Sequence, residues 1–287
     1  MNSGDLIYPV CPICGKKDTL VTKLKVEGLP VVECTKDGMI FFRPNVSHDI
    51  HNNFLDRNYW IAPAFQEAIG SGNYNFDVYL DILASDAKVK GYPDYLEPEH
   101  LQAKVSWGRR LMQWFLRYAQ GRSLKTVLEI GCATGHMMKG FFDMGGFSYG
   151  VGIDVSPLII EHGKQLLKNY IDNKKLDLFT GECWEYNAGV KFDCIIMWDS
   201  FEHIQYPEKA LGWVKDNTSS EALMIIHTPD AELAGDADWY LWSPKQHCFF
   251  YSKETADIFL SKFGFQRIAE KISPEPDEMV LIYKKKW

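Results

Sequence analysis

One stretch of the chain, residues 125–157, constrains the fold more than any other. It opens with an apolar run of strand type, passes through a turn that contains Gly131 and Gly135, and continues with helical spacing over residues 136–144. A second apolar run ends in Asp154. This succession of strand, glycine turn, helix, strand and acid is half of a nucleotide-binding α/β unit. Glycine lets the backbone approach a ligand closely, and Asp154 is placed to accept hydrogen bonds from ribose hydroxyls.

From residue 124 to the end of the chain, apolar runs of strand type alternate with helical segments, and the stretch above is the first part of this series. Such alternation predicts an α/β fold, a parallel sheet with helices on both faces. The connection over residues 273–277 is too short for a parallel crossover, so the final strand should be antiparallel. A further helix, from Pro98 to about Ala119, should pack against the sheet. We expect strands at 125–130, 149–153, 176–179, 192–198, 221–227, 264–271 and 278–284, and helices at 136–144, 157–170, 207–216 and 252–263.

Length and charge limit the classes of protein to consider. The chain has 287 residues, enough for one large domain or two. Its net charge of −7 argues against broad nucleic-acid binding. It shows neither an apolar run long enough to cross a bilayer nor a signal-peptide pattern, so we expect no membrane association. Seven cysteines without an export signal favour a reducing compartment, and the expected location is cytoplasmic.

Residues 1–45 look like a small separate unit built around cysteines. Cys11 and Cys14 form a Cys-x-x-Cys-Gly knuckle, which aims two thiolates at one tetrahedral ion. Where a zinc ribbon has a second pair, this chain has Cys34 followed by Asp37, and a carboxylate is an acceptable zinc ligand. Three interpretations stay open: a structural zinc site of these four residues, a degenerate ribbon without its metal, and unrelated cysteines. Short strands are expected at 20–26, 30–34 and 39–42.

Residues 46–120 are expected to form a helical connector that precedes the main domain at 121–287. The part from 46 to 97 is rich in aromatic residues and interrupted by glycines. In one interpretation its aromatics pack on the main domain, and in the other it covers a substrate pocket as a lid. We expect a connector that acts in part as a lid.

The segment over residues 129–135, EIGCATG, resembles motif I of the class I S-adenosylmethionine-dependent methyltransferases, in which an acid precedes three alternating glycines. Ala133 takes the place of the middle glycine. The dinucleotide signature G-x-G-x-x-G fails, because Ala133 and His136 stand where it needs glycine, and a nicotinamide oxidoreductase is therefore disfavoured. The resemblance implies a Rossmann-like seven-stranded methyltransferase sheet with an antiparallel last strand, and S-adenosylmethionine as cofactor.

The resemblance also implies roles for single positions. Glu129 would lie behind the glycine loop and order the site around the methionine moiety, Asp154 would bind the ribose, and Glu182 would lie near the adenine amine. For Glu182 the alternative is a solvated loop carboxylate. The cofactor contacts expected in this way are Glu129, Gly131, Cys132, Ala133, Gly135, Asp154, Val155, Glu182, Cys183 and Asp199.

A Glu-His pair, Glu202-His203, follows the fourth strand and resembles a signature of many small-molecule methyltransferases. In ubiquinone-type O-methyltransferases an acid three residues earlier, here Asp199, joins the pair in a divalent-metal site. Three ligands leave a hard cation site incomplete, so we do not expect Mg²⁺ or Mn²⁺. The alternative is that the pair makes structural hydrogen bonds. His203 is also a candidate catalytic residue.

An insertion at residues 234–252 follows the fifth strand, at the edge where open α/β sheets bind ligands. It resembles an acceptor-pocket segment of the same family, Pro-x-x-His-x-x-x-aromatic-Ser, and makes His247 the first candidate for general base. An imidazole with a pKa of about 6.5 can remove a proton at neutral pH. A structural role of His247 in the loop is the alternative. The aromatic residues expected to shape or to pack the acceptor pocket are Trp239, Tyr240, Trp242 and Tyr251.

The cysteine knuckle followed by Tyr59-Trp60 resembles a bacterial group that includes sugar C-methyltransferases. The chain lacks the His-Glu-His segment of the C-methylating members, which weakens C-methylation. We therefore predict an S-adenosylmethionine-dependent methyltransferase of a small molecule, with oxygen first as acceptor atom and nitrogen or carbon next. Its pathway would make a sugar, a surface glycan or a secondary metabolite. The alternatives are a non-catalytic cofactor-binding module and an RNA methyltransferase, and the oligomeric state stays open.

Overall fold

The computed structural model describes residues 6–7, 9–26, 28–46, 48, 51–52, 55, 98–237, 239, 241–242, 246–273 and 277–286. Most of the connector expected at 46–97, with Tyr59 and Trp60, lies outside the described residues, and so does Tyr240.

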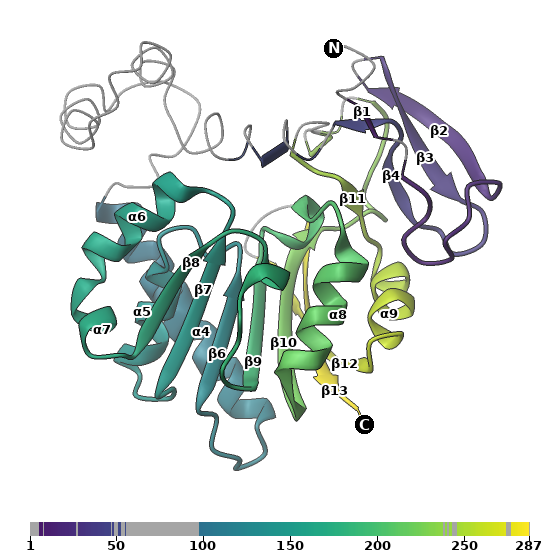
Figure 1. Cartoon of the computed structure of the whole chain (residues 1–287). Helices are drawn as coiled ribbons and strands as arrows, with labels where there is room; N and C mark the ends of the chain where they lie inside the picture. The colour runs from purple at the N-terminus through teal and green to yellow at the C-terminus, as the bar shows by residue number, and fades with distance from the viewer. Residues whose placement is uncertain are drawn as a thin grey trace, which may run out of the picture.

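A seven-stranded sheet forms the centre of the molecule (Figure 1), with strand order β12-β13-β10-β9-β6-β7-β8. The strands β10, β9, β6, β7 and β8 pair in parallel, whereas β13 is antiparallel to both β10 and β12. The seven expected strands and the antiparallel last strand are thus confirmed. Their bounds are β6 Thr126–Ile130, β7 Tyr149–Asp154, β8 Leu176–Thr180, β9 Phe192–Trp198, β10 Thr218–Pro229, β12 Phe265–Ile272 and β13 Glu278–Lys285.

Helices cover both faces of this sheet, with α4 behind it and α8 in front in Figure 1. One apolar core joins α4 and α5 to the sheet, and a second joins α8 and α9 to its other face. The helix expected at 157–170 divides at Leu167; Ser156 caps its start, because its Oγ accepts a hydrogen bond from the Ile159 amide. The bounds are α4 Pro98–Tyr118, α5 His136–Asp143, α6 Pro157–Leu166, α7 Lys168–Asp172, η3 Cys183–Glu185, η4 Phe201–His203, α8 Pro207–Asn217 and α9 Lys253–Ser261.

The helices α4 and α5 cross at two glycines. A Cβ atom on Gly140 would stand 2.2 Å from the carbonyl oxygen of Val105, and one on Gly108 would stand 1.9 Å from that of Met137. Because Gly108 and Gly140 have no side chain, the backbones of the two helices can approach this closely. Since α5 follows the glycine turn directly, this crossing also positions the turn.

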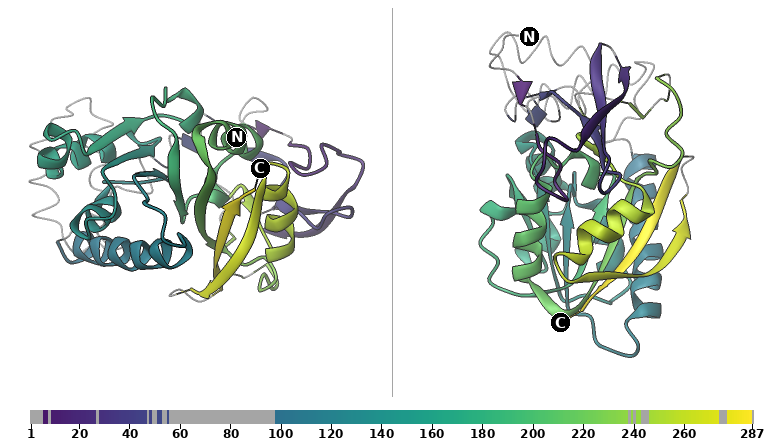
Figure 2. Two further views of the ribbon diagram at one scale, coloured as in Figure 1. Left: turned by 90° about the horizontal axis from the view of Figure 1, so that it is seen from below. Right: turned by 90° about the vertical axis from the view of Figure 1, so that its right-hand side faces the viewer.

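The N-terminal unit is a small antiparallel sheet that includes a strand from the insertion. Its order is β11-β4-β3-β2, and β11 pairs Phe249 with Phe41 of β4. The strands expected at 20–26, 30–34 and 39–42 are present. Figure 2 shows this sheet above one end of the main domain. The bounds are β1 Leu6–Ile7, β2 Leu20–Val26, β3 Leu29–Cys34, β4 Ile40–Phe42, β5 Asn45–Val46 and β11 Phe249–Phe250.

A shared apolar core explains why the insertion stays with the N-terminal unit. Trp242 contacts Phe42 and Phe250 with ring centroids 6.0 Å and 4.4 Å apart, and Trp239 lies 5.0 Å from Trp242. These rings belong to one buried cluster with residues of β2, β3 and β4. Among the described helices, none combines the length and the apolar character needed to cross a membrane.

Candidate active site

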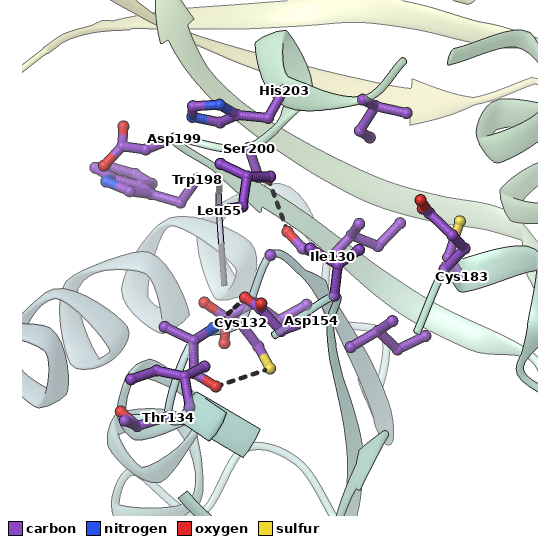
Figure 3. Close-up of a pocket in the computed structure, with 18 of the residues that line it drawn as sticks. Leu55, Ile130, Cys132, Thr134, Asp154, Cys183, Trp198, Asp199, Ser200 and His203 are labelled. Atoms are coloured by element: carbon purple, nitrogen blue, oxygen red, sulfur yellow. Dashed lines mark hydrogen bonds between the residues drawn. The ribbon is translucent and has the colours of Figure 1, made fainter. Parts of the chain in front are cut away.

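A pocket opens at the carboxyl ends of β6, β7 and β9, and Figure 3 shows its walls. All of the expected cofactor residues except Gly135 line it. Loops at this edge of an open α/β sheet are the usual ligand site of the architecture. The pocket is therefore the site to which the sequence motifs pointed.

The glycine turn brings backbone against the pocket through three left-handed residues. The φ angles are 75° at Gly131, 49° at Ala133 and 74° at Gly135. A Cβ atom on Gly131 would stand 2.4 Å from that of Ser200, so this position requires glycine. Ala133 adopts the same left-handed conformation at a cost of about 1–2 kcal/mol, which explains how it can replace a glycine. Gly135 lies at the start of α5, behind the lining residues.

Asp154 is buried at the end of β7, and amides of two turns hold its carboxylate. One oxygen accepts a hydrogen bond from the Ala133 amide at 2.9 Å, and the other accepts one from the Ser156 amide at 3.0 Å. Backbone donors on both oxygens fix the orientation of the carboxylate before any ligand arrives.

Glu129 lies 3% exposed in the pocket wall. Its Oε2 has no hydrogen-bond partner among the described residues. Burial and the nearby Asp154 charge, against the opposing charge of Lys104, raise the pKa of Glu129 to about 8. A buried carboxyl oxygen without a donor is costly, and a ligand that brings a donor or a positive charge would satisfy it.

Glu182 and Cys183 line the end of the pocket formed by the loop after β8. The Glu182 Oε1 atom lies 3.1 Å from His48 Nε2 and accepts a 3.4 Å hydrogen bond from Asn52 Nδ2. Burial raises the pKa of Glu182, and His48 opposes the shift. His48 and Asn52 could not be identified from the sequence, since residues 46–97 carry no motif that marks them.

The two candidate catalytic histidines lie next to each other, with ring centroids 4.9 Å apart. The Nδ1 of His203 donates to the Gln246 carbonyl at 2.9 Å, and that of His247 donates to the Leu241 carbonyl at 2.7 Å. Because a carbonyl only accepts, Nδ1 carries the proton in both rings, which leaves Nε2 as the basic atom. His203 lines the pocket, and His247 stands behind it.

Burial keeps both rings neutral. It lowers the pKa of His203 well below its usual range, with a further contribution from His247, and it lowers the pKa of His247 to about 4. Glu202 Oε1 lies 3.7 Å from His203 Nε2, while Glu202 Oε2 accepts a hydrogen bond from the Thr228 hydroxyl at 2.9 Å. Burial, and then the Asp199 charge, raise the pKa of Glu202 to about 8. The pair thus offers a neutral imidazole beside a carboxyl group.

Three of the aromatic residues expected around the acceptor, Trp239, Trp242 and Tyr251, do not line this pocket. The two tryptophans pack into the core shared with the N-terminal sheet. Tyr251 is fully buried against Phe201, with ring centroids 4.3 Å apart, and its hydroxyl has no partner within the described part of the chain. These rings hold the loop that carries His247.

The four expected metal ligands of the N-terminal unit lie together. Their donor atoms, from Cys11, Cys14, Cys34 and Asp37, are all within 4.8 Å of one another. The sulfur atoms of Cys14 and Cys34 are 3.7 Å apart, and Cys11 Sγ lies 3.2 Å from Asp37 Oδ1. The Cys14 amide donates to Cys11 Sγ, and the Met39 amide donates to Asp37. Four donor atoms gathered in this way could serve as ligands of one metal ion.

Several pocket residues follow from the fold and not from a motif. Leu101 and Lys104 reach the pocket because α4 packs on α5, and no local pattern identifies them. The start of α5 adds His136, whose pKa burial lowers to about 4; its Nδ1 pairs with the Thr134 hydroxyl at 2.8 Å. Further lining residues of this kind are His48, His51, Asn52, Leu55, Met137, Trp198, Ser200, Ile204 and Gln205.

Residues 100–270 match the family model described as a methyltransferase domain. No curated protein matches the chain. Among solved structures it resembles the magnesium protoporphyrin IX methyltransferase of Synechocystis PCC 6803, with 13% identity and a TM-score of 0.52 over 84% of this chain and 100% of that one. It also resembles an S-adenosylmethionine-dependent methyltransferase of Clostridium acetobutylicum ATCC 824, with 14% identity and a TM-score of 0.50 over 75% of this chain and 99% of that one. At such identities the likeness concerns the fold.

Proposed function

The chain belongs to the methyltransferase-domain family, and we propose that it transfers a methyl group from S-adenosylmethionine to an oxygen atom of a small molecule. The observation that carries this proposal is the pocket itself. It brings the glycine turn, Asp154 and Glu182 together at the carboxyl edge of the sheet. Nitrogen and carbon acceptors remain the second choice, and the pathway we propose makes a sugar, a surface glycan or a secondary metabolite.

The residues present fit this cofactor. The unpaired oxygen of Glu129 suits the ammonium group of the methionine part, because a cation compensates a buried carboxylate. Asp154, held by backbone amides, suits the ribose hydroxyls. Glu182 and the loop after β8 suit the adenine amine, which donates hydrogen bonds. Bound there, the cofactor supplies an electrophilic methyl group.

The chain's own task is to position the acceptor and to remove its proton. His203 faces the pocket with its proton on Nδ1, so its Nε2 can take a proton from an acceptor hydroxyl as the new oxygen–carbon bond forms. The Glu202 carboxyl group lies beside that nitrogen and, once ionised, stabilises the resulting imidazolium. His247 contacts the His203 ring and keeps the loop in place. His203 is therefore proposed as the catalytic residue, in direct contact with the acceptor, and His247 as a positioning residue that acts through the His203 ring.

The first test is cofactor binding measured by isothermal titration calorimetry. We expect the wild-type chain to bind S-adenosylmethionine and S-adenosylhomocysteine. Asp154→Asn should weaken the binding of both compounds by about 10- to 100-fold, since the ribose loses one charged acceptor, a change of about 1.5–3 kcal/mol. The control is Asp172→Asn, which changes an exposed aspartate of α7 and should leave both affinities as they are. A wild-type chain that binds neither compound would refute the proposal.

Binding without turnover would favour the non-catalytic module instead. A panel of hydroxyl, amine and RNA acceptors with radiolabelled S-adenosylmethionine separates these cases. Transfer to a small hydroxyl compound supports the proposal, whereas transfer confined to RNA selects the RNA methyltransferase.

We also propose that Cys11, Cys14, Cys34 and Asp37 hold one structural zinc ion. The donor set suits zinc, which binds thiolate sulfur and accepts a carboxylate oxygen in tetrahedral sites. A sulfur–sulfur separation of 3.7 Å is close to the edge of such a tetrahedron, about 3.8 Å for zinc–sulfur bonds of about 2.3 Å. Backbone amides directed at Cys11 and Asp37 supply the supporting hydrogen bonds that metal ligands need.

A further inference from the structure

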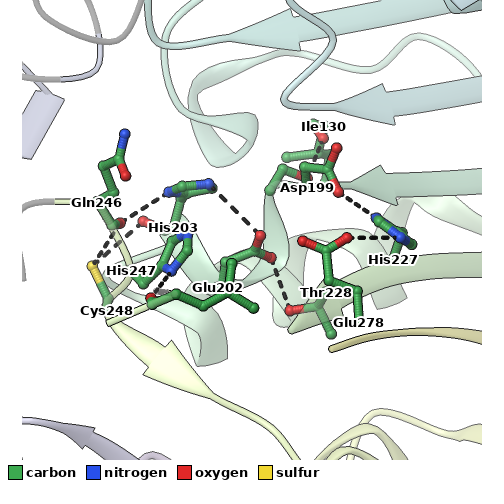
Figure 4. A network of polar contacts seen from close by, with 12 residues as sticks. Ile130, Asp199, Glu202, His203, His227, Thr228, Gln246, His247, Cys248 and Glu278 are labelled. Carbon is green, nitrogen blue, oxygen red and sulfur yellow. Dashed lines mark hydrogen bonds and ion pairs between the residues drawn. The ribbon is translucent and has the colours of Figure 1, made fainter. Parts of the chain in front are cut away.

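A chain of charged side chains runs from the pocket into the sheet and takes no part in the mechanism above (Figure 4). Asp199 follows β9 and lines the pocket, with its side chain 37% exposed. His227 near the end of β10 lies behind it and is 0% exposed, and its Nδ1 forms an ion pair with Asp199 Oδ1. On the far side, His227 Nε2 lies 3.0 Å from Glu278 Oε2 and 2.8 Å from Ser273 Oγ. We call Asp199, His227 and Glu278 the charge relay.

The Nδ1 atom of His227 pairs with the Asp199 carboxylate, and its Nε2 atom lies beside the Glu278 carboxylate and the Ser273 hydroxyl, so these neighbours favour a proton on both ring nitrogens. The ring is therefore an imidazolium. Burial alone would lower the pKa of His227, but the Asp199 charge, followed by Glu278, raises it to about 10. Conversely, burial would raise the pKa of Asp199, but the pair with His227 outweighs it and lowers that pKa. The Asp199 carboxyl group, which lines the pocket, is thus an anion at neutral pH.

Packing holds the relay in one geometry. The indole of Trp198 stacks on the His227 ring with centroids 4.3 Å apart and planes at 10°, and Trp107 of α4 packs on Trp198 at 5.2 Å. Asp199 has a φ of 51°, a left-handed conformation that costs a residue with a Cβ about 1–2 kcal/mol. This strained backbone conformation places the Asp199 carboxylate between the pocket and His227.

The position of the relay along the pocket follows from its neighbours. Ser200, the next residue, packs against Gly131, and its hydroxyl donates to the Ile130 carbonyl at 2.7 Å. Asp199 therefore lies at the glycine-turn end, which serves the methionine part, while Glu182 lies at the adenine end. Further charged or titratable groups that interact with Asp199 are Lys104 from α4, Glu202 and His203 from η4, and His247 from the insertion, while Glu129 and Asp154 line the same pocket.

We propose that this relay lets the enzyme distinguish its sulfonium cofactor from the thioether product, with Asp199 as the specificity-determining residue and His227 and Glu278 as positioning residues. The inference rests on the proposed cofactor. S-adenosylmethionine carries a positive sulfur and S-adenosylhomocysteine a neutral one. A fixed anion in a partly buried pocket attracts only the former through its sulfur, which favours binding of the donor and release of the product.

The test compares dissociation constants of the two compounds by calorimetry, at about pH 6, 7 and 8. For Asp199→Asn we expect S-adenosylmethionine to bind about 10-fold more weakly and S-adenosylhomocysteine to change by less than about 3-fold, because only the charge on sulfur differs. The matched control is Glu182→Gln at the adenine end, which should weaken both compounds equally and leave their ratio unchanged.

His227→Asn tests the positioning role through the pH profile. Asparagine can still donate to Asp199 but brings no charge, so the pKa of Asp199 should rise and the preference for S-adenosylmethionine should fall as the pH is lowered. The wild-type ratio should stay constant over the same range. If His227 had a purely structural role, the variant would bind both compounds more weakly by the same factor at every pH.

An unchanged ratio in Asp199→Asn overturns the relay, as does a ratio in His227→Asn that does not respond to pH. If His227→Asn does not fold, the same pH profile can be measured for Glu278→Gln, because this variant removes the second carboxylate beside the imidazolium. Failure of the wild-type chain to bind either compound would instead refute the cofactor proposal, so the two failures are distinguishable.

Discussion

Glu129 lies in an environment very different from that of a side chain in water. It is buried, one of its oxygens lacks a donor among the described residues, and its pKa is about 8. At neutral pH it is therefore mostly protonated in the free protein. The ammonium group proposed to lie beside it would favour the carboxylate, so binding should release a proton.

We predict that S-adenosylhomocysteine binding at about pH 7 releases up to about one proton per chain and tightens as the pH rises towards 8. Calorimetry in buffers of different ionisation enthalpy measures the release. Glu129→Gln should abolish most of it, whereas Glu161→Gln on the exposed face of α6 should not. Equal proton release from wild type and Glu129→Gln would show that another group titrates.

At the scale of elements, the α4–α5 crossing decides where the glycine turn lies. Gly140 and Gly108 allow the two helices to approach until backbone meets backbone. The crossing also brings Leu101 and Lys104 of α4 to the pocket. A change of spacing between these helices would therefore alter both the stability of the domain and the shape of the site.

Gly140→Ala should destabilise the protein by about 1–3 kcal/mol, because the new Cβ would clash with the Val105 carbonyl and overpack the interface. Thermal or urea unfolding measures this. Gly212→Ala in α8 is the matched control: nothing lies within 4 Å of its Cβ, so it should be neutral or stabilise by up to about 1 kcal/mol. If the two variants unfold alike, the close crossing is not what limits the spacing.

At the scale of the whole molecule, the N-terminal unit and the main domain share structure at two points. The insertion strand β11 completes the N-terminal sheet and carries the loop of His247 with it. The segment after that sheet places His48 on Glu182 and His51 on the His203 carbonyl, 2.7 Å away. The state of the N-terminal unit should therefore affect the active site.

We predict about one zinc ion per purified chain, measured by plasma mass spectrometry, and its loss in Cys34→Ser. Because a structural zinc ion would stabilise the small sheet, this variant should also bind S-adenosylhomocysteine more weakly, by about 3- to 10-fold. Cys194→Ala, in the core of the main sheet, is the control and should retain its zinc. Wild-type protein without zinc would contradict the metal site, and full affinity in Cys34→Ser would contradict the coupling.

Much of this protein could be predicted from local patterns. Apolar runs, helical spacing and the short last connection predicted the seven strands and the antiparallel end. Motif spacing predicted the residues of the pocket wall from Glu129 to Asp199. These residues follow strands whose carboxyl ends meet at one edge of the sheet, so they come together for any conformation of the loops. The four N-terminal donors converge for a similar reason, since a knuckle and a hairpin have few possible geometries.

The other features depend on how distant segments of the chain pack together. Trp239 and Trp242 belong to a core with the N-terminal sheet, and aromatic residues look alike in a sequence whether they line a pocket or fill a core. His227 and Glu278 form the charge relay although β10 and β13 are distant in the chain, because β13 is inserted beside β10. Local chemistry specifies the strands, turns and cofactor motif, whereas the charge of a buried group depends on neighbours that only the packing of distant segments supplies.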